Sequence, residues 1–154
     1  MQIESADMTL LDIRTQLRAL LPGVINTINQ ERNDFELKQI ADKHYFLNVE
    51  EAINATQFVV ISGALQKAKN AGPRQVTSLL VNVFVGFTPH LYGANKDFAV
   101  CASYRYQAAL MAAFAKMELP FGNLQFVGAE PPGSLRIGNK ALYGALVQYD
   151  IQLF

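Results

Sequence analysis

The side chains that could carry chemistry are few, and they are scattered along the sequence. His44 and His90 are the only histidines, and neither stands in a metal-binding spacing such as H-E-x-x-H. His90 follows a proline, and we expect it in an ordinary loop. The single cysteine, Cys101, lies on the apolar side of a predicted helix, so we expect a small buried hydrophobic side chain there rather than a reactive thiolate.

The charged residues do not form a catalytic pattern either. Glu50 and Glu51 are adjacent, and on a helix adjacent side chains point about 100° apart, which does not make an acid–base couple. Arg105 stands between Tyr104 and Tyr106, where stacking or an ion pair is a more ordinary role than a ligand clamp. Phosphate-binding and nucleophile-elbow motifs are absent from the sequence. We therefore predict a protein that is not an enzyme, with no catalytic, cofactor-binding or metal-binding residues.

The composition limits the classes of partner. The chain has 154 residues, which is the size of one domain spanning residues 1–154. Hydrophobic residues make up 51% and charged residues only 17%, so either other subunits cover part of the surface or the composition varies by chance. The 13 acidic and 13 basic residues cancel and form no basic run, so specific nucleic-acid binding is not expected. The first ten residues are acidic and polar, and no apolar run reaches transmembrane length, so we expect a cytoplasmic protein with no membrane contact.

The elements that must position any site begin with an amphipathic helix. Thr9-Leu-Leu-Asp12 fits a capping box, and apolar residues then recur at helical spacing. We expect this helix to end near Leu21, because Pro22 and Gly23 follow it. Residues 24–29 alternate weakly and predict a short strand, and residues 46–56 predict a short helix.

Two strands and a long helix follow. Residues 58–65 and 75–87 predict an antiparallel hairpin whose second strand is apolar on both faces and therefore central, with residues 66–74 as its loop. Asn95 is a suitable N-cap for a helix over residues 96–117. The strongest apolar stripe of that helix contains Val100, Tyr104, Met111 and Phe114, with Cys101, Ala108 and Ala115. Alanines 102, 109 and 113 line the opposite side, so the helix is either deeply buried or packed on two bodies, and the second body would be another subunit with the alanine side as a candidate contact.

The last part of the chain predicts two more strands. Residues 124–129 form the first strand, residues 130–134 (EPPGS) a rigid surface loop, residues 135–137 a short edge segment and residues 138–140 a turn. The final strand, residues 142–154, has an apolar face from Tyr143 to Leu153. Its length is about 44 Å if straight, so we expect it to project, curl or pair with another chain. The order of elements predicts an α+β fold.

A resemblance adds to this. The segment GNLQFVGAEPPGSLRIGNKALYGALVQYDIQLF, residues 122–154, preceded by a long helix, resembles the tail terminator proteins of long-tailed bacteriophages in the Mu-like prophage tail protein family. The resemblance covers residues 58–154 and loosely the first helix, and residues 26–56 depart from the pattern. It implies a four- or five-stranded mixed or antiparallel sheet, with a long helix packed across one face and an amphipathic N-terminal helix.

The resemblance also implies a function. Such a protein would be a structural part of the virion, assembled in the host cytoplasm. It would form a homo-oligomeric, six-fold ring that caps the tail tube and sheath and meets the head-proximal connector or neck proteins. No enzyme activity, metal or cofactor is implied. The alternatives are another neck or tail protein, such as a head–tail completion or tube-like subunit, and a small ligand-binding α+β domain with Arg105, His90 or Tyr143 in its pocket.

Overall fold

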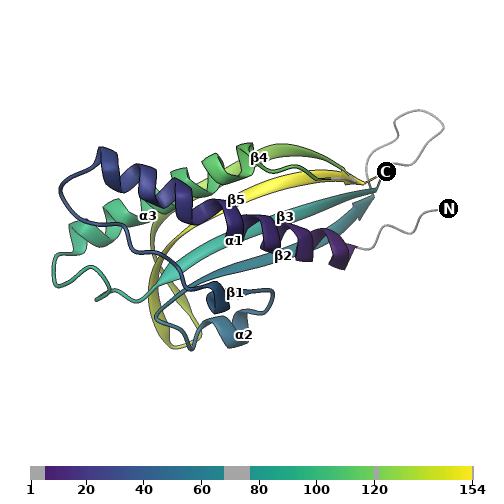
Figure 1. The fold of residues 1–154 in the computed structure, drawn as a ribbon. Helices are drawn as coiled ribbons and strands as arrows, with labels where there is room; N and C mark the ends of the chain where they lie inside the picture. Colours follow the sequence, from purple (N-terminus) through teal and green to yellow (C-terminus); the bar gives the residue numbers. More distant parts are fainter. Residues whose placement is uncertain (1–5, 68–76, 120–121, 154) are drawn as a thin grey trace.

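The computed structural model describes residues 6–67, 77–119 and 122–153, and within them an α+β fold (Figure 1). In chain order the elements are α1 (Ala6–Glu31), η1 (Asp42–His44), β1 (Tyr45–Phe46), α2 (Val49–Ala52), β2 (Gln57–Lys67), β3 (Thr77–Phe87), α3 (Lys96–Ala115), β4 (Gly122–Ile137) and β5 (Lys140–Leu153). The predicted fold class is confirmed: a five-stranded sheet carries the long helix across one face and the amphipathic N-terminal helix beside it.

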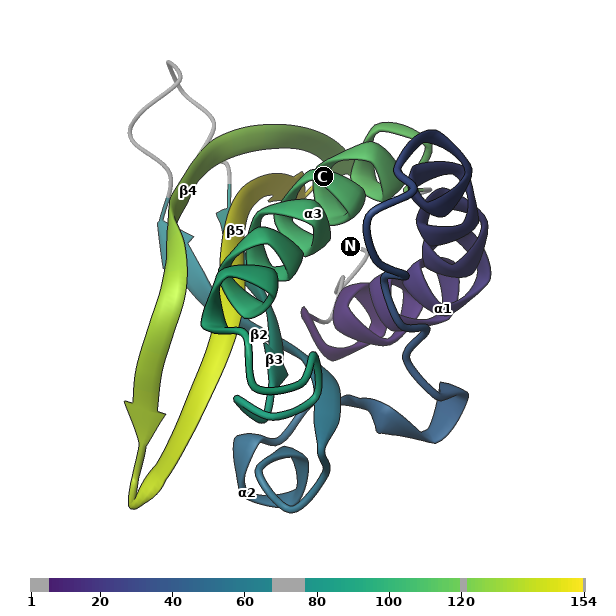
Figure 2. The same cartoon turned by 90° about the vertical axis from the view of Figure 1, so that its left-hand side faces the viewer.

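The sheet is mixed, with the strand order β1-β2-β3-β5-β4. β1 runs parallel to β2, and every other neighbouring pair is antiparallel. β5 lies inside the sheet between β3 and β4, so the predicted final strand is paired on both sides within its own chain. The strands curl strongly, and the hairpin between β4 and β5 extends beyond α1 and α3 to the level of α2 (Figures 1 and 2).

The main core lies between the sheet and the two long helices. α1 and α3 lie on the same face of the sheet and contact each other (Figure 2). The alternation predicted for the central strand is confirmed, because its odd-numbered side chains from Leu79 to Phe87 are all buried against the helices. A smaller cluster on the opposite face joins α2 to the sheet through Ala52, Phe58, Val60 and Leu142.

Three expectations for the region of α1 were wrong. The helix does not end near Leu21 but continues through Pro22 to Glu31, and residues 24–29 are helical rather than a strand. Proline removes one backbone hydrogen bond, but the buried side chains of Leu21, Val24 and Ile25 hold the turn around it in place. Thr9 is not an N-cap: it lies inside the helix, which begins at Ala6.

The predicted EPPGS loop was also wrong. Residues 130–134 belong to β4, which runs from Gly122 to Ile137 with register shifts between Phe126 and Gly128 and between Glu130 and Gly133. The bulges absorb the prolines, which cannot donate to a regular ladder. The predicted turn at 138–140 is confirmed. Gly138 has a positive φ of 61° and Asn139 does not, as in the type II′ turn that suits a tight hairpin.

The remaining boundaries are close to the predictions. The first hairpin strand is longer than predicted, because it spans 57–67 and includes the first two residues of the predicted loop. The second strand is described over 77–87, and its predicted residues 75–76 and the rest of the loop lie outside the described residues. The short helix predicted within 46–56 is α2. The side chain of Asn95 caps α3 by accepting a hydrogen bond from the Asp97 backbone N–H at 3.0 Å, as predicted.

Candidate interaction surface

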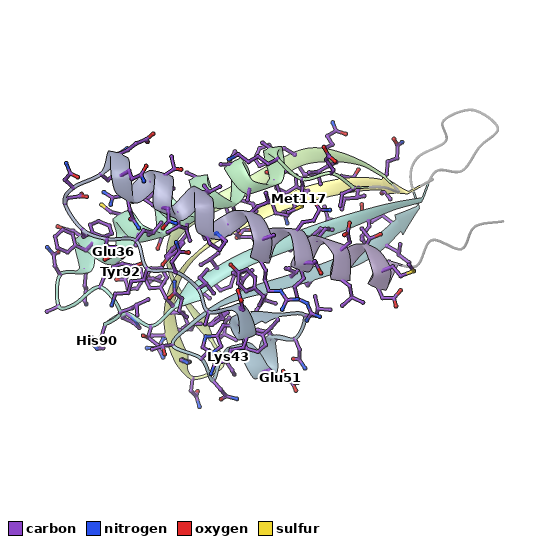
Figure 3. All side chains as sticks on the ribbon, in the orientation of Figure 1. Glu36, Lys43, Glu51, His90, Tyr92 and Met117 are labelled. Carbon is purple, nitrogen blue, oxygen red and sulfur yellow. The ribbon has the colours of Figure 1, made fainter. Side chains whose placement is uncertain are left out.

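The residues considered for chemistry lie in separate parts of the molecule. His90 lies exposed in the loop before α3, and Glu51 lies on α2, far from Met117 at the end of α3 (Figure 3). His44 stacks on Phe46 with the ring centroids 6.1 Å apart. Within the described residues no three His, Cys, Asp or Glu side chains gather as a metal site would require. None of the described helices is long and apolar enough to cross a membrane.

Arg105 has the structural role that was predicted, with different partners. Its guanidinium donates to the Asp34 carboxylate at 2.7 Å and stacks over the Phe35 ring, 4.0 Å from the ring centroid. The hydrogen bond from Arg105 holds the pKa of Asp34 below its usual value. These contacts fasten the segment after α1 to α3, so the side chain of Arg105 is already engaged by its own chain.

A buried cluster of hydrogen bonds also holds α3 against the neighbouring segments. The Tyr106 hydroxyl donates to the Lys38 carbonyl at 2.7 Å, and it accepts from the Gln57 amide and from the Tyr92 hydroxyl, each at 2.5 Å. The Tyr92 oxygen in turn accepts from the Lys38 backbone N–H at 3.0 Å. Burial raises the pKa of both tyrosines above the usual value. The cluster joins α3, β2 and two connecting segments, and its hydroxyls satisfy one another rather than facing an open cavity.

The packing of α3 reverses the prediction. The alanine side, the candidate contact with another subunit, packs in the core of the chain itself: Ala102, Ala109 and Ala113 are fully buried. The stripe expected in the core faces outward, except for Phe114, which stacks on Tyr149 with the ring centroids 4.1 Å apart. Cys101, expected to be buried, is exposed. Small side chains let the helix lie close to the sheet, and this favours the alanine side.

The sequence contains a signal for the buried face that the prediction missed. Residues 99, 102, 103, 106, 109, 110, 113 and 114 recur at helical spacing and are all buried. Six of these are apolar, Tyr106 joins the hydrogen-bond cluster, and Ser103 donates to the Ala99 carbonyl within the helix. Both faces of α3 are therefore apolar. The face with more large side chains was predicted to be buried, but it is the exposed one.

An exposed apolar surface results, which we call the α3 surface. Its stripe is formed by Val100, Cys101, Tyr104, Ala108, Met111 and Ala115, with exposed fractions of 36% for Val100, 55% for Tyr104 and 38% for Met111. The stripe leads into a groove of about 470 Å³ between the end of α3 and the sheet, which is lined by Met111, Phe114, Ala115, Met117, Leu119, Leu124, Phe126 and Tyr149. Among the lining residues, Phe126 on β4 remains about half exposed. Apolar side chains gathered in this way are typical of a protein–protein contact.

A second hollow lies on the opposite face of the sheet. It has a volume of about 370 Å³ and is lined by residues of β3, β4 and β5, including Phe84, Glu130 and Leu135. Gly86 and Gly144 pair across the strands next to it, and the Phe84 ring lies over both. A Cβ atom on Gly144 would come 2.5 Å from that ring and 2.4 Å from the Val85 carbonyl oxygen. The glycines therefore make room for the ring.

The residues named for a small-molecule pocket are not brought together. Tyr143 stacks on Phe87 and lines a shallow hollow with Pro89, Lys96 and residues of the β4–β5 hairpin. Neither His90 nor Arg105 contributes to the wall of that hollow. No family model matches the sequence, and a comparison with curated proteins finds no significant match.

Proposed function

We propose that this chain is a structural protein of a long-tailed phage, the tail terminator. In this role it forms a ring, hexameric by the resemblance of residues 58–154, that caps the tail tube and sheath and joins them to the neck. The single observation that carries the assembly part of the proposal is the α3 surface. Its apolar stripe and groove lie outside the buried core of the chain. No cofactor or metal takes part.

The size of the exposed side chains supports a protein partner for the α3 surface. Tyr104 and Phe126 each leave about half of their surface in water. Full burial of a large apolar side chain contributes about 1.5–3 kcal/mol, so covering these residues together with Val100 and Met111 gives several kcal/mol toward association. A ring requires two different contact patches on each subunit. The projecting β4–β5 hairpin supplies a second candidate patch.

A tube-like subunit remains the second candidate within the same class of proteins. The observation in its favour is the curved sheet, whose four long strands bear helices on one face only apart from the short α2. A ligand-binding domain is not favoured, because Arg105, His90 and Tyr143 do not converge.

Removal of the gene from the phage or prophage that encodes it tests the function. A terminator stops tube growth, so we expect tails of uncontrolled length and heads without attached tails in electron micrographs. Tails absent altogether would identify a tube subunit, and tails of normal length on leaking heads would identify a head-completion protein. Normal particles would refute a role in the tail.

Charge placed on the α3 surface tests the proposed contact. We expect Tyr104→Glu to fold normally, because Tyr104 is 55% exposed, and to fail to restore tail length. Thr15→Glu, on an exposed position of α1, is the matched control and should restore it. Equal rescue by both variants would show that the α3 surface is not a contact.

A further inference from the structure

The sheet has two edges whose backbone is open within the described part of the chain. β1 pairs only with Val59 and Val60, so the outer edge of β2 from Ile61 onward has no neighbour there. At the other side of the sheet, β4 pairs only with β5. The N–H and C=O groups along an open edge are ready to pair with another extended segment.

Each edge is blocked at one end and free at the other. β1 covers the first part of β2, whereas residues 62–66 are exposed and contain neither proline nor charge. On β4, two prolines and the register shift between Glu130 and Gly133 interrupt the ladder, whereas residues 122–126 contain neither proline nor charge. Natural edges that avoid pairing carry charge or proline, and these two free segments carry neither.

The two free segments lie at the same level of the sheet. Leu65 pairs with Leu79, Leu79 with Ile151, and Ile151 with Leu124, so one row of residues crosses the sheet from one open edge to the other. The strand directions also match, because three successive antiparallel pairings leave β4 antiparallel to β2. A second copy placed beside the first therefore presents its β4 to β2 in antiparallel orientation without a shift along the strands.

We propose that residues 123–126 of one copy add to residues 63–66 of the next copy as an antiparallel strand pair. This inference rests on the proposed function, because it adds a strand-to-strand contact between the subunits of the ring to the contact proposed for the α3 surface. A neighbour related by rotation without a shift closes a ring, whereas a shift would produce a climbing filament. The matched levels therefore favour closure, and the occupant of each open edge is a second copy of this chain.

The side chains on the helix-bearing face fit this pairing. Leu124 of one copy comes opposite Leu65, which is 59% exposed in the single chain. Phe126, 46% exposed, comes opposite Gly63 in the next row. The side chains of Leu79 and Leu10 already lie against Gly63, so a Phe126 ring from the next copy would add to an existing apolar contact. The pairing thus covers exposed apolar side chains as well as open backbone.

Engineered cysteines test the pairing directly. In a Cys101→Ser background, Leu65→Cys and Leu124→Cys lie on opposite edges of one chain, so only a neighbour can bridge them. Directly opposite residues of an antiparallel pair have Cβ atoms about 4.5–5.5 Å apart, close enough for a disulfide after a small adjustment. We expect mild oxidation of the concentrated protein to give a ladder of cross-linked species above the dimer. The control, Leu65→Cys with Arg136→Cys at the blocked end of β4, should give none.

The outcomes separate this inference from the proposed function. An oligomer seen by light scattering that does not cross-link, or a dimer formed by Leu65→Cys alone, would overturn the pairing and leave the tail-length test unaffected. A protein that stays monomeric at every concentration, or that cross-links only to a different protein, would also overturn it. As an independent measurement, we expect Leu65→Lys to raise the concentration for half-assembly about tenfold or more, whereas Gln152→Lys, exposed on the inner strand β5, should not. Circular dichroism confirms the fold of each variant.

Discussion

Gly144→Ala is expected to destabilise the protein although it adds a single methyl group. The new Cβ atom would lie 2.4 Å from the Val85 carbonyl oxygen and 2.5 Å from the Phe84 ring, and the first of these is backbone that cannot rotate away. Overpacking of this kind costs about 1–3 kcal/mol. Loss of chain freedom in the unfolded state offsets about 0.4–1 kcal/mol of that cost. The free energy of unfolding therefore falls by up to about 2.6 kcal/mol, with a central value of about 1.3 kcal/mol.

Gly128→Ala is the matched control. Gly128 also lies in the sheet, on β4, but a Cβ atom there would meet no atom within 4 Å. We expect this variant to be unchanged or slightly more stable than the parent. Denaturant unfolding gives the free energies, and thermal unfolding should show a drop of about 2–4 °C for each kcal/mol lost. Equal stability of the two variants would refute the claim that close packing of Phe84 requires the glycine.

Two further predictions concern the tyrosine cluster and the final strand. Burial raises the pKa values of Tyr92 and Tyr106, so these groups stay protonated in the folded state while the unfolded chain ionises near pH 10. Stability should be level below about pH 10 and fall above it, by up to about 1.4 kcal/mol per pH unit for each group. Denaturant midpoints from pH 8 to 11 measure this, and Tyr106→Phe should make the fall shallower; an unchanged slope would contradict the assignment. Removal of residues 151–154 should cost at least about 2–5 kcal/mol and impair assembly, because Ile151 is fully buried between Leu79 and Leu124. Normal folding and cross-linking of the truncated protein would show that the end of β5 is neither core nor interface.

The sequence predicts β3 and β5 best, because alternation of apolar side chains over a long segment indicates a strand with one buried face. The odd-numbered residues of β3 and of β5 from Ala145 to Ile151 meet the helices, as the period of two requires. The curl predicted for β5 is also present (Figure 2). β5 also projects, because its hairpin with β4 extends beyond α1 and α3 (Figure 2). It does not offer an edge to another chain, since both of its sides pair within the chain and the free edges belong to β2 and β4.

The errors occurred where local signals compete with packing. Pro22 is a strong helix breaker in isolation, but buried neighbours on both sides outweigh the one lost hydrogen bond. The two prolines of β4 suggest a loop, but a bulged edge strand also accepts them. α3 carries two apolar stripes, and only the tertiary structure shows that the alanine stripe packs inward and leaves Tyr104 exposed. The α3 surface therefore could not be located from periodicity alone.

The place of β5 in the sheet has a consequence for synthesis on the ribosome. β4 emerges before β5, and β5 is its only neighbour among the described strands, so β4 remains without a partner until β5 has been translated. During that interval the nascent chain exposes one side of β3 and the whole of β4. A paused or prematurely released chain would expose unpaired strands that aggregate with other copies. Chaperones that bind such strands would prevent this aggregation until β5 is complete.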